Sequence, residues 1–91
     1  MYCENKMKQS EAILEIKNLC LNTLTDDDIL GLIGCTPNQL AWIIKGYKDQ
    51  YSALKGRSIW DDIVRTLEKV PEWISSAENL KIALSIIFLV V

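Results

Sequence analysis

The sequence predicts a single all-α domain that covers residues 1–91 and forms a five-helix bundle. Two observations support this fold class. Apolar residues recur at the three- and four-residue spacing of helix faces, and three segments start with a threonine or serine placed three residues before an acidic or amide residue. Hydrophobic residues make up 49% of the chain, which is enough to build a core and excludes intrinsic disorder. We expect no strand.

Two N-terminal helices are predicted on either side of a break at residues 22–24. The first covers about residues 10–21, and its apolar side chains share one face: Ile13, Ile16, Leu19 and Cys20. The second starts at Thr25, which forms a capping box with Asp28, and its three aspartates at residues 26–28 suit the positive end of the helix dipole. Its apolar residues are Ile29, Leu30, Leu32 and Ile33. We expect it to stop at Gly34.

The third helix has the clearest start in the chain. Thr36 is its N-cap, Pro37 suits the first helical position, and Gln39 completes a capping box. Its buried side is expected to hold Leu40, Ile43 and Ile44. Gly46 is expected to end it, as glycine commonly does after a helix. Residues 47–57 are then a polar and aromatic connection, with one helical turn inside it as an open alternative.

Two further helices are predicted in the C-terminal half. The fourth starts at Ser58 and closes before Pro71. Its inward residues are expected to be Ile59, Trp60, Ile63, Val64, Leu67 and Val70. Ser75 and Glu78 form a third capping box, from which the last helix is predicted to cover about residues 76–90.

The cysteines and the absence of histidine exclude several kinds of chemistry. Without histidine the chain has no histidine-based triad or zinc site. Cys3, Cys20 and Cys35 are too far apart for a CxxC metal knuckle, and their odd number argues against a disulfide framework, so we expect reduced thiols and a cytoplasmic protein. Asp61 and Asp62 point about 100° apart on a helix and are expected to be solvated. We expect no enzyme, no cofactor and no metal.

Neither end of the sequence predicts association with a membrane. Residues 1–10 are polar and lack the apolar run of a signal peptide. Residues 82–91 are apolar except for Ser85, but a bilayer span needs about 20 such residues. We therefore expect no membrane partner.

The run from Gly34 to Gly46, GCTPNQLAWIIKG, resembles the helix-turn-helix of the lambda-repressor/Cro family. That family reads Gly-Val-Ser and then a recognition helix with apolar residues at matching places and a closing glycine. The positions that such a motif keeps apolar or glycine are held here by Ile29, Ile33, Gly34, Cys35, Leu40 and Ile43. The resemblance covers about residues 25–46, is loose to residue 73 and does not include the last helix. A helical bundle without this motif is the alternative.

The resemblance implies sequence-specific binding to double-stranded DNA by a transcriptional regulator of the small phage-repressor type. Carried over position by position, the DNA-facing residues are Thr36, Pro37, Asn38, Ala41, Trp42 and Lys45. The Asn38 amide suits adenine, Ala41 leaves room for a thymine methyl, and Thr36 and Lys45 suit phosphate. Trp42 departs from the family, which usually has a polar residue there, and suits a DNA contact or a protein interface.

The charge distribution favours the same segment. The formal net charge is −2, yet residues 36–58 carry a net charge of +3, and both flanking segments are negative. The basic residues of this segment are Lys45, Lys48, Lys55 and Arg57. The aspartates at residues 26–28 oppose DNA binding, because they would repel phosphate. They favour the alternative function, a small protein-interaction module such as an inhibitor or antirepressor.

The last helix is predicted to form a homodimer interface. From Leu80 onward it is apolar on every side, and a monomer this small covers only about half of such a helix. The residues assigned to this interface are Leu80, Leu84, Ile86, Ile87 and Phe88. Burial of the helix at the centre of the monomer is the alternative.

Overall fold

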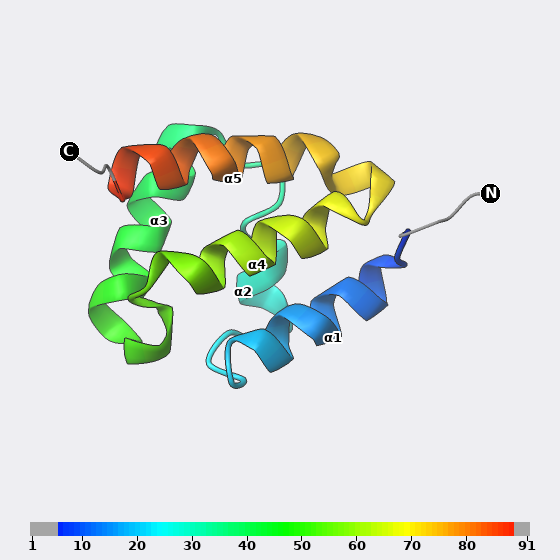
Figure 1. Ribbon diagram of the computed structural model, residues 1–91, viewed down its shortest axis with the longest axis horizontal. Helices are drawn as coiled ribbons and strands as arrows, with labels where there is room; N and C mark the ends of the chain where they lie inside the picture. The colour runs from blue at the N-terminus through cyan, green and yellow to red at the C-terminus, as the bar shows by residue number, and fades with distance from the viewer. Residues whose placement is uncertain (1–5, 89–91) are drawn as a thin grey trace.

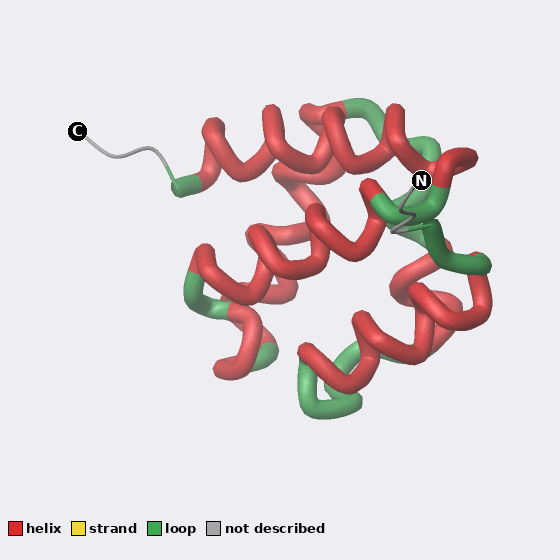
Figure 2. The backbone as a smooth tube through the Cα atoms, turned by 45° about the vertical axis from the view of Figure 1, so that its right-hand side comes forward, coloured by secondary structure: helices red, strands yellow, loops and turns green. Residues whose placement is uncertain are grey.

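The computed structural model describes residues 6–88, which form five α-helices and two short 3-10 helices (Figure 1). In chain order the elements are α1 (Gln9–Leu19), α2 (Asp26–Leu30), α3 (Pro37–Gln50), η1 (Ser52–Leu54), α4 (Arg57–Glu68), η2 (Pro71–Trp73) and α5 (Ile74–Ile87). The described residues contain no strand (Figure 2). The all-α prediction is therefore confirmed.

The long helices are arranged around α4, which lies between α1 and α5 in both views (Figures 1 and 2). α3 packs chiefly on α5 and on η1, while α2 packs on α1. The last helix of the chain is thus in contact with both α3 and α4. This arrangement places α5, which lies outside the resemblance, directly beside the helix that the resemblance assigns to DNA.

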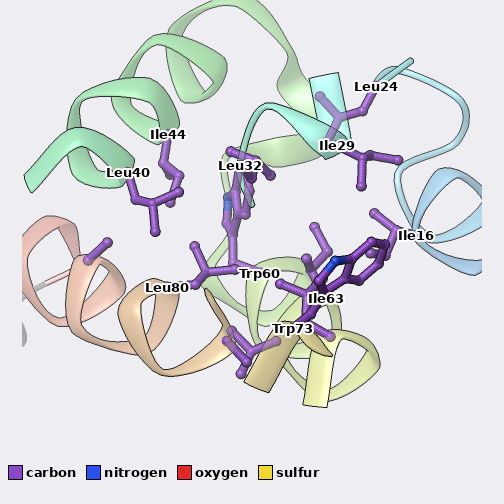
Figure 3. Packing of buried hydrophobic residues seen from close by; sticks show 14 of the residues in the cluster. Ile16, Leu24, Ile29, Leu32, Leu40, Ile44, Trp60, Ile63, Trp73 and Leu80 are labelled. Atoms are coloured by element: carbon purple, nitrogen blue, oxygen red, sulfur yellow. The ribbon is translucent and has the colours of Figure 1, made fainter. Parts of the chain in front are cut away.

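One apolar core joins all the helices, and Trp60 lies within it (Figure 3). The Trp60 side chain is 0% exposed, and its indole N–H donates a hydrogen bond of 2.8 Å to the backbone oxygen of Leu54. Tyr47 of α3 stacks on the Trp60 ring, with 6.2 Å between the ring centroids. A buried tryptophan contributes a large apolar area, and here its polar atom also has a partner. Trp60 therefore ties α4 to η1 and to the second half of α3.

The two threonine capping boxes form as predicted. The Thr25 hydroxyl accepts from the Asp28 N–H at 3.1 Å, and the Asp28 carboxylate accepts from the Thr25 N–H at 3.0 Å. Thr36 and Gln39 repeat this exchange at 3.2 and 3.0 Å. The third box, at Ser75, is wrong. Because η2 leads directly into α5, which begins at Ile74, Ser75 already lies inside the helix and caps nothing.

Several predicted helix ends also differ from the structure. α1 ends at Leu19 rather than residue 21, because Leu21 and Asn22 adopt positive φ angles of 55° and 62°. α3 continues through Gly46 to Gln50. The stacking of Tyr47 on Trp60 explains this extension, since it holds the fourth turn against the core. The predicted end of the last helix near residue 90 lies outside the described residues.

Candidate nucleic-acid interface

The turn before α3 is held by two side chains of α5. Gly34 has a φ of +83°, a conformation that glycine adopts without a Cβ clash, and its N–H donates to the Ser76 hydroxyl at 3.0 Å. The Asn79 amide donates to the backbone oxygen of Cys35 at 3.2 Å. Sequence reasoning missed Ser76 and Asn79, because they lie 42 and 44 residues from their partners and no local pattern marks them. α5 therefore fixes the direction in which α3 leaves the turn.

The inner face of α3 carries the apolar residues that the sequence assigned to it. Leu40 and Ile44 are 0% exposed, and Ile43 is half-buried against the same core. The resemblance expects Leu40 and Ile43 to pack across Ile29 and Ile33, and all four side chains do belong to or border this core. α3 is nevertheless braced mainly by α5, while α2 is braced by α1.

The outer face of α3 gathers most of the residues predicted to meet DNA. Asn38, Trp42 and Lys45 are exposed, and the Trp42 side chain is 78% exposed. Ala41 is half-buried between them. At the N-terminal end Thr36 is exposed, but its hydroxyl oxygen is occupied by the capping bond from Gln39, and Pro37 is half-buried. The face thus offers an amide, a methyl group, an indole and an ammonium group within two turns.

A groove of about 340 Å³ lies between this outer face and the end of α5. We call it the Trp42 groove; its lining residues are Asn38, Ala41, Trp42, Lys45, Lys48, Ile86 and Ile87. Two neighbouring hollows also have Trp42 in their walls. The ammonium of Lys48, which lines the groove, lies 4.3 Å from the centroid of the Phe88 ring, a cation–π contact that links α3 to the end of α5. Ile86 and Ile87 were not predicted to share a site with α3.

The basic residues that follow the turn before α3 differ in whether they form salt bridges. Within residues 6–88, Lys45, Lys48 and Lys55 form no salt bridge. Arg57, which the sequence grouped with them, begins α4 and pairs with Asp61 at 3.5 Å. Asp62 pairs separately with Arg65 at 3.3 Å, so the two adjacent carboxylates do not converge. The unpaired lysines are therefore the charges that remain available to a ligand.

Two of the three aspartates at the start of α2, Asp26 and Asp28, interact with groups inside the molecule. Asp28 caps α2, and Asp26 pairs with Lys17 of α1 at 2.8 Å while its side chain stays 61% exposed. Asp28 also acts on α3, because burial and then this negative charge raise the pKa of Tyr47. The roles of Asp26 and Asp28 in the described structure are therefore a salt bridge and a helix cap.

The residues assigned to a dimer interface lie in two different surroundings. Leu80 and Leu84 are 1% exposed and pack inside the monomer, because α3 and α4 both contact α5. They are therefore not open to a second copy. Ile86 is 52% exposed, and Ile87 and Phe88 are half-buried beside α3. The exposed apolar residues of α5 are Ile74, Ile82 and Ile86.

The cysteines of the described chain are structural. Cys20 is fully buried, and burial raises the pKa of its thiol to about 11, so the thiol stays protonated near neutral pH. The Cys35 thiol donates to the backbone oxygen of Gly31 at 3.1 Å. Within residues 6–88 no three cysteine or carboxylate side chains come together as a metal site. No helix in this range is both long and apolar enough to cross a bilayer.

Comparison of the chain with known protein families, with curated proteins and with solved structures gave no match.

Proposed function

We propose that this protein is a sequence-specific DNA-binding regulator that reads double-stranded DNA with α3. The observation that supports this most directly is the outer face of α3, where the exposed Asn38 amide and the Lys45 ammonium group line the same groove. In the part of the chain that the structure describes, Lys45 forms no salt bridge. An α-helix fits the major groove of B-DNA, and an asparagine can form two hydrogen bonds with adenine there. Lysines without a salt bridge suit phosphate, since they lose no internal ion pair on binding.

The proposal includes a division of roles along the segment. Asn38 and Ala41 lie in the first two turns of α3 and contact base edges. Lys45 and Lys55 contact phosphate groups on either side of the DNA major groove. Arg57 is a weaker candidate because Asp61 already pairs with it. The protein acts in the cytoplasm.

A homodimer is part of this proposal, because two copies would engage two half-sites about one helical turn of DNA apart. The residues of α5 that can meet a second copy are Ile82 and Ile86, whose side chains are 51% and 52% exposed. They lie four residues apart and therefore share one face of the helix. Sedimentation of the purified chain at high micromolar concentration tests this part, and a monomer at that concentration would contradict it.

A binding titration tests DNA recognition. The purified protein is titrated against fragments of its source genome, including the region upstream of its own gene, at two salt concentrations. We expect Asn38→Ala to weaken specific binding by about 1–3 kcal/mol and to relax the sequence preference. Lys45→Ala should weaken specific and non-specific binding alike and reduce the salt slope by about one.

Lys8→Ala is the matched control, because Lys8 is an exposed lysine at the start of α1, far from α3 (Figure 1). This variant should bind DNA like the parent protein. If no fragment is retained at low salt, or if Lys8→Ala and Lys45→Ala behave alike, DNA reading by α3 is refuted.

A further inference from the structure

Trp42 is unusual for a residue that only reads DNA. Its indole is 78% exposed in the middle of α3, and Ile86 and Ile87 stand across the groove from it. Apart from the thymine methyl group, base edges and phosphates are polar, so a DNA duplex that engages Asn38 and Lys45 leaves Trp42, Ile86 and Ile87 without a matching apolar surface. Large exposed aromatic side chains are the usual anchors of protein–protein interfaces. The Trp42 groove therefore has the composition of a protein-binding site.

The charges around the groove define which kind of protein segment fits. Lys45 and Lys48 line it, and neither forms a salt bridge with any residue from 6 to 88. The Lys48 ammonium lies over the Phe88 ring, 4.3 Å from its centroid. Because residues 36–58 carry a net charge of +3 in a chain of net charge −2, the complement of this surface is acidic.

A second copy of this chain is the wrong occupant for this groove. A symmetric contact through the Trp42 groove would bring Lys45 and Lys48 of the two copies together, and like charges in an interface oppose association. Of the two residues in the proposed dimer contact on α5, Ile82 does not line the groove and Ile86 does, so the dimer contact and the groove overlap at Ile86 alone.

We infer that the Trp42 groove binds an acidic amphipathic segment of another protein, and that this segment competes with DNA for α3. Apolar side chains of the segment fill the space between Trp42, Ile86 and Ile87, and its carboxylates pair with Lys45 and Lys48. A helix with apolar residues at three- and four-residue spacing matches a groove between two helices. Binding of the acidic segment does not depend on the proposed DNA function, whereas its competition with DNA rests on that function.

The test uses a panel of fluorescently labelled synthetic peptides, each rich in glutamate with leucine or phenylalanine anchors at different helical spacings. A matched panel carries lysine in place of glutamate. The full chain is titrated with each peptide by anisotropy, and tryptophan emission is followed with the unlabelled peptides. Since Trp60 and Trp73 are 0% and 4% exposed, a change toward the emission of a buried indole reports on Trp42.

We expect at least one acidic peptide to bind and to shift the tryptophan emission to shorter wavelength, while its lysine counterpart does not bind. Trp42→Ala should lower the affinity for the acidic peptide by about tenfold or more, and Lys45→Glu should lower this affinity as well. Ile74→Ala is the control on the same helix and should leave peptide binding unchanged, because Ile74 is exposed but belongs neither to the groove nor to the proposed dimer contact. Sedimentation of Trp42→Ala checks that the variant folds and keeps the oligomeric state of the parent.

The DNA proposal is separated from this inference by Lys55→Ala, because Lys55 is exposed but does not line the groove. This variant should lose DNA affinity and keep peptide affinity, and excess acidic peptide should displace DNA from the parent protein. If no acidic peptide binds at about 1 mM, or if Trp42→Ala binds like the parent, the inference is overturned whether or not DNA binds. If peptide binds but no DNA does, the groove assignment stands and the proposed function fails.

Discussion

α2 and α3 start in the same way and then differ. Each begins after a threonine, Thr25 or Thr36, whose hydroxyl and whose partner three residues later exchange hydrogen bonds with the backbone. α2 nevertheless stops after 5 residues, whereas α3 continues for 14. The reason lies outside both helices: α5 and the stacked ring of Trp60 support the length of α3. A capping box therefore sets where a helix begins, and tertiary neighbours set how far it runs.

The charges of the two helices show the same contrast. Asp26 and Asp28 act inside the molecule, one in a salt bridge and one in a cap. Lys45 makes no salt bridge among the described residues and stands beside an exposed indole, that of Trp42. Charges that are satisfied locally stabilise the fold, and charges left without a partner are the ones available to a ligand.

The largest expected effect comes from truncating a buried leucine of α3, compared with an exposed leucine of α2. Leu40→Ala in α3 should lower the free energy of unfolding by about 2–5 kcal/mol, because this side chain is 0% exposed. Leu30→Ala in α2 should cost less than about 1 kcal/mol, because Leu30 is 46% exposed. Urea denaturation measures both. Equal losses would contradict the burial of Leu40 as the cause of its larger effect.

A pH effect of similar size is expected at the junction that precedes α2. Burial raises the pKa of Cys20 from 9.0 to about 11, so the folded state keeps its proton where the unfolded chain loses it. The unfolding free energy should therefore be unaffected by this thiol below pH 9. It should fall by about 2–3 kcal/mol as the pH rises to about 11.

Denaturation midpoints measured from pH 8 to pH 11 test this effect. Cys20→Ala should flatten the alkaline decline, although it starts from a lower stability because it removes a buried sulfur. Burial also raises the pKa of Tyr47, so a smaller decline of the same sign remains in the variant. If the denaturation midpoints of the parent and of Cys20→Ala fall equally from pH 8 to pH 11, the Cys20 thiol is not the cause of the decline.

The threonine caps at the starts of α2 and α3 should stabilise the protein by about the same free energy. Thr25→Ala and Thr36→Ala should each cost about 1 kcal/mol, since each leaves one amide at the start of its helix without an acceptor. Thr25→Ser and Thr36→Ser are the matched controls, because serine keeps the hydroxyl. A much larger loss for Thr36→Ala would mean that this cap also orients the turn before α3.

The turn between the two helices is expected to depend on α5. Ser76→Ala removes the acceptor of the Gly34 N–H and should cost about 0.5–1.5 kcal/mol, because water still reaches this amide. Ser75→Ala, one residue earlier and exposed, is the control and should change stability by less than about 0.5 kcal/mol. Hydrogen exchange at Gly34 provides the local readout, and unchanged exchange in Ser76→Ala would exclude the bond.

The smallest expected effect is a gain. Gly46→Ala should stabilise the protein by about 0.5–1 kcal/mol, because Gly46 lies inside α3 and a Cβ there meets no atom within 4 Å. Gly34→Ala should destabilise it, since the φ of +83° at this position strains any residue with a side chain. Thermal unfolding measures both signs. If Gly46→Ala instead destabilises the protein, α3 ends at Gly46, as the sequence pattern predicts.

The candidate site was predictable in part. Asn38, Ala41, Trp42 and Lys45 share one face of α3 because helical spacing alone brings them together. Ile86 joins them only through the packing of α5 on α3, and nothing in its own neighbourhood in the sequence indicates that contact. The same packing turned Leu80 and Leu84, predicted for a dimer, into core residues.

By itself the sequence determined the fold class, the starts of α2 and α3, and the inward faces of α3 and α4. Each of these depends on residues within one or two turns of each other, so hydrogen bonds and apolar spacing along the chain are enough to specify them. Tertiary structure alone decided that α3 passes Gly46 and that Ser76 and Asn79 hold the turn. It also decided that Trp42 and Ile86 face each other across one groove. The turn and the groove need residues more than 40 positions apart to meet, and the extension of α3 needs Tyr47 to reach Trp60 on another helix. Only the packing of the whole core brings such residues together.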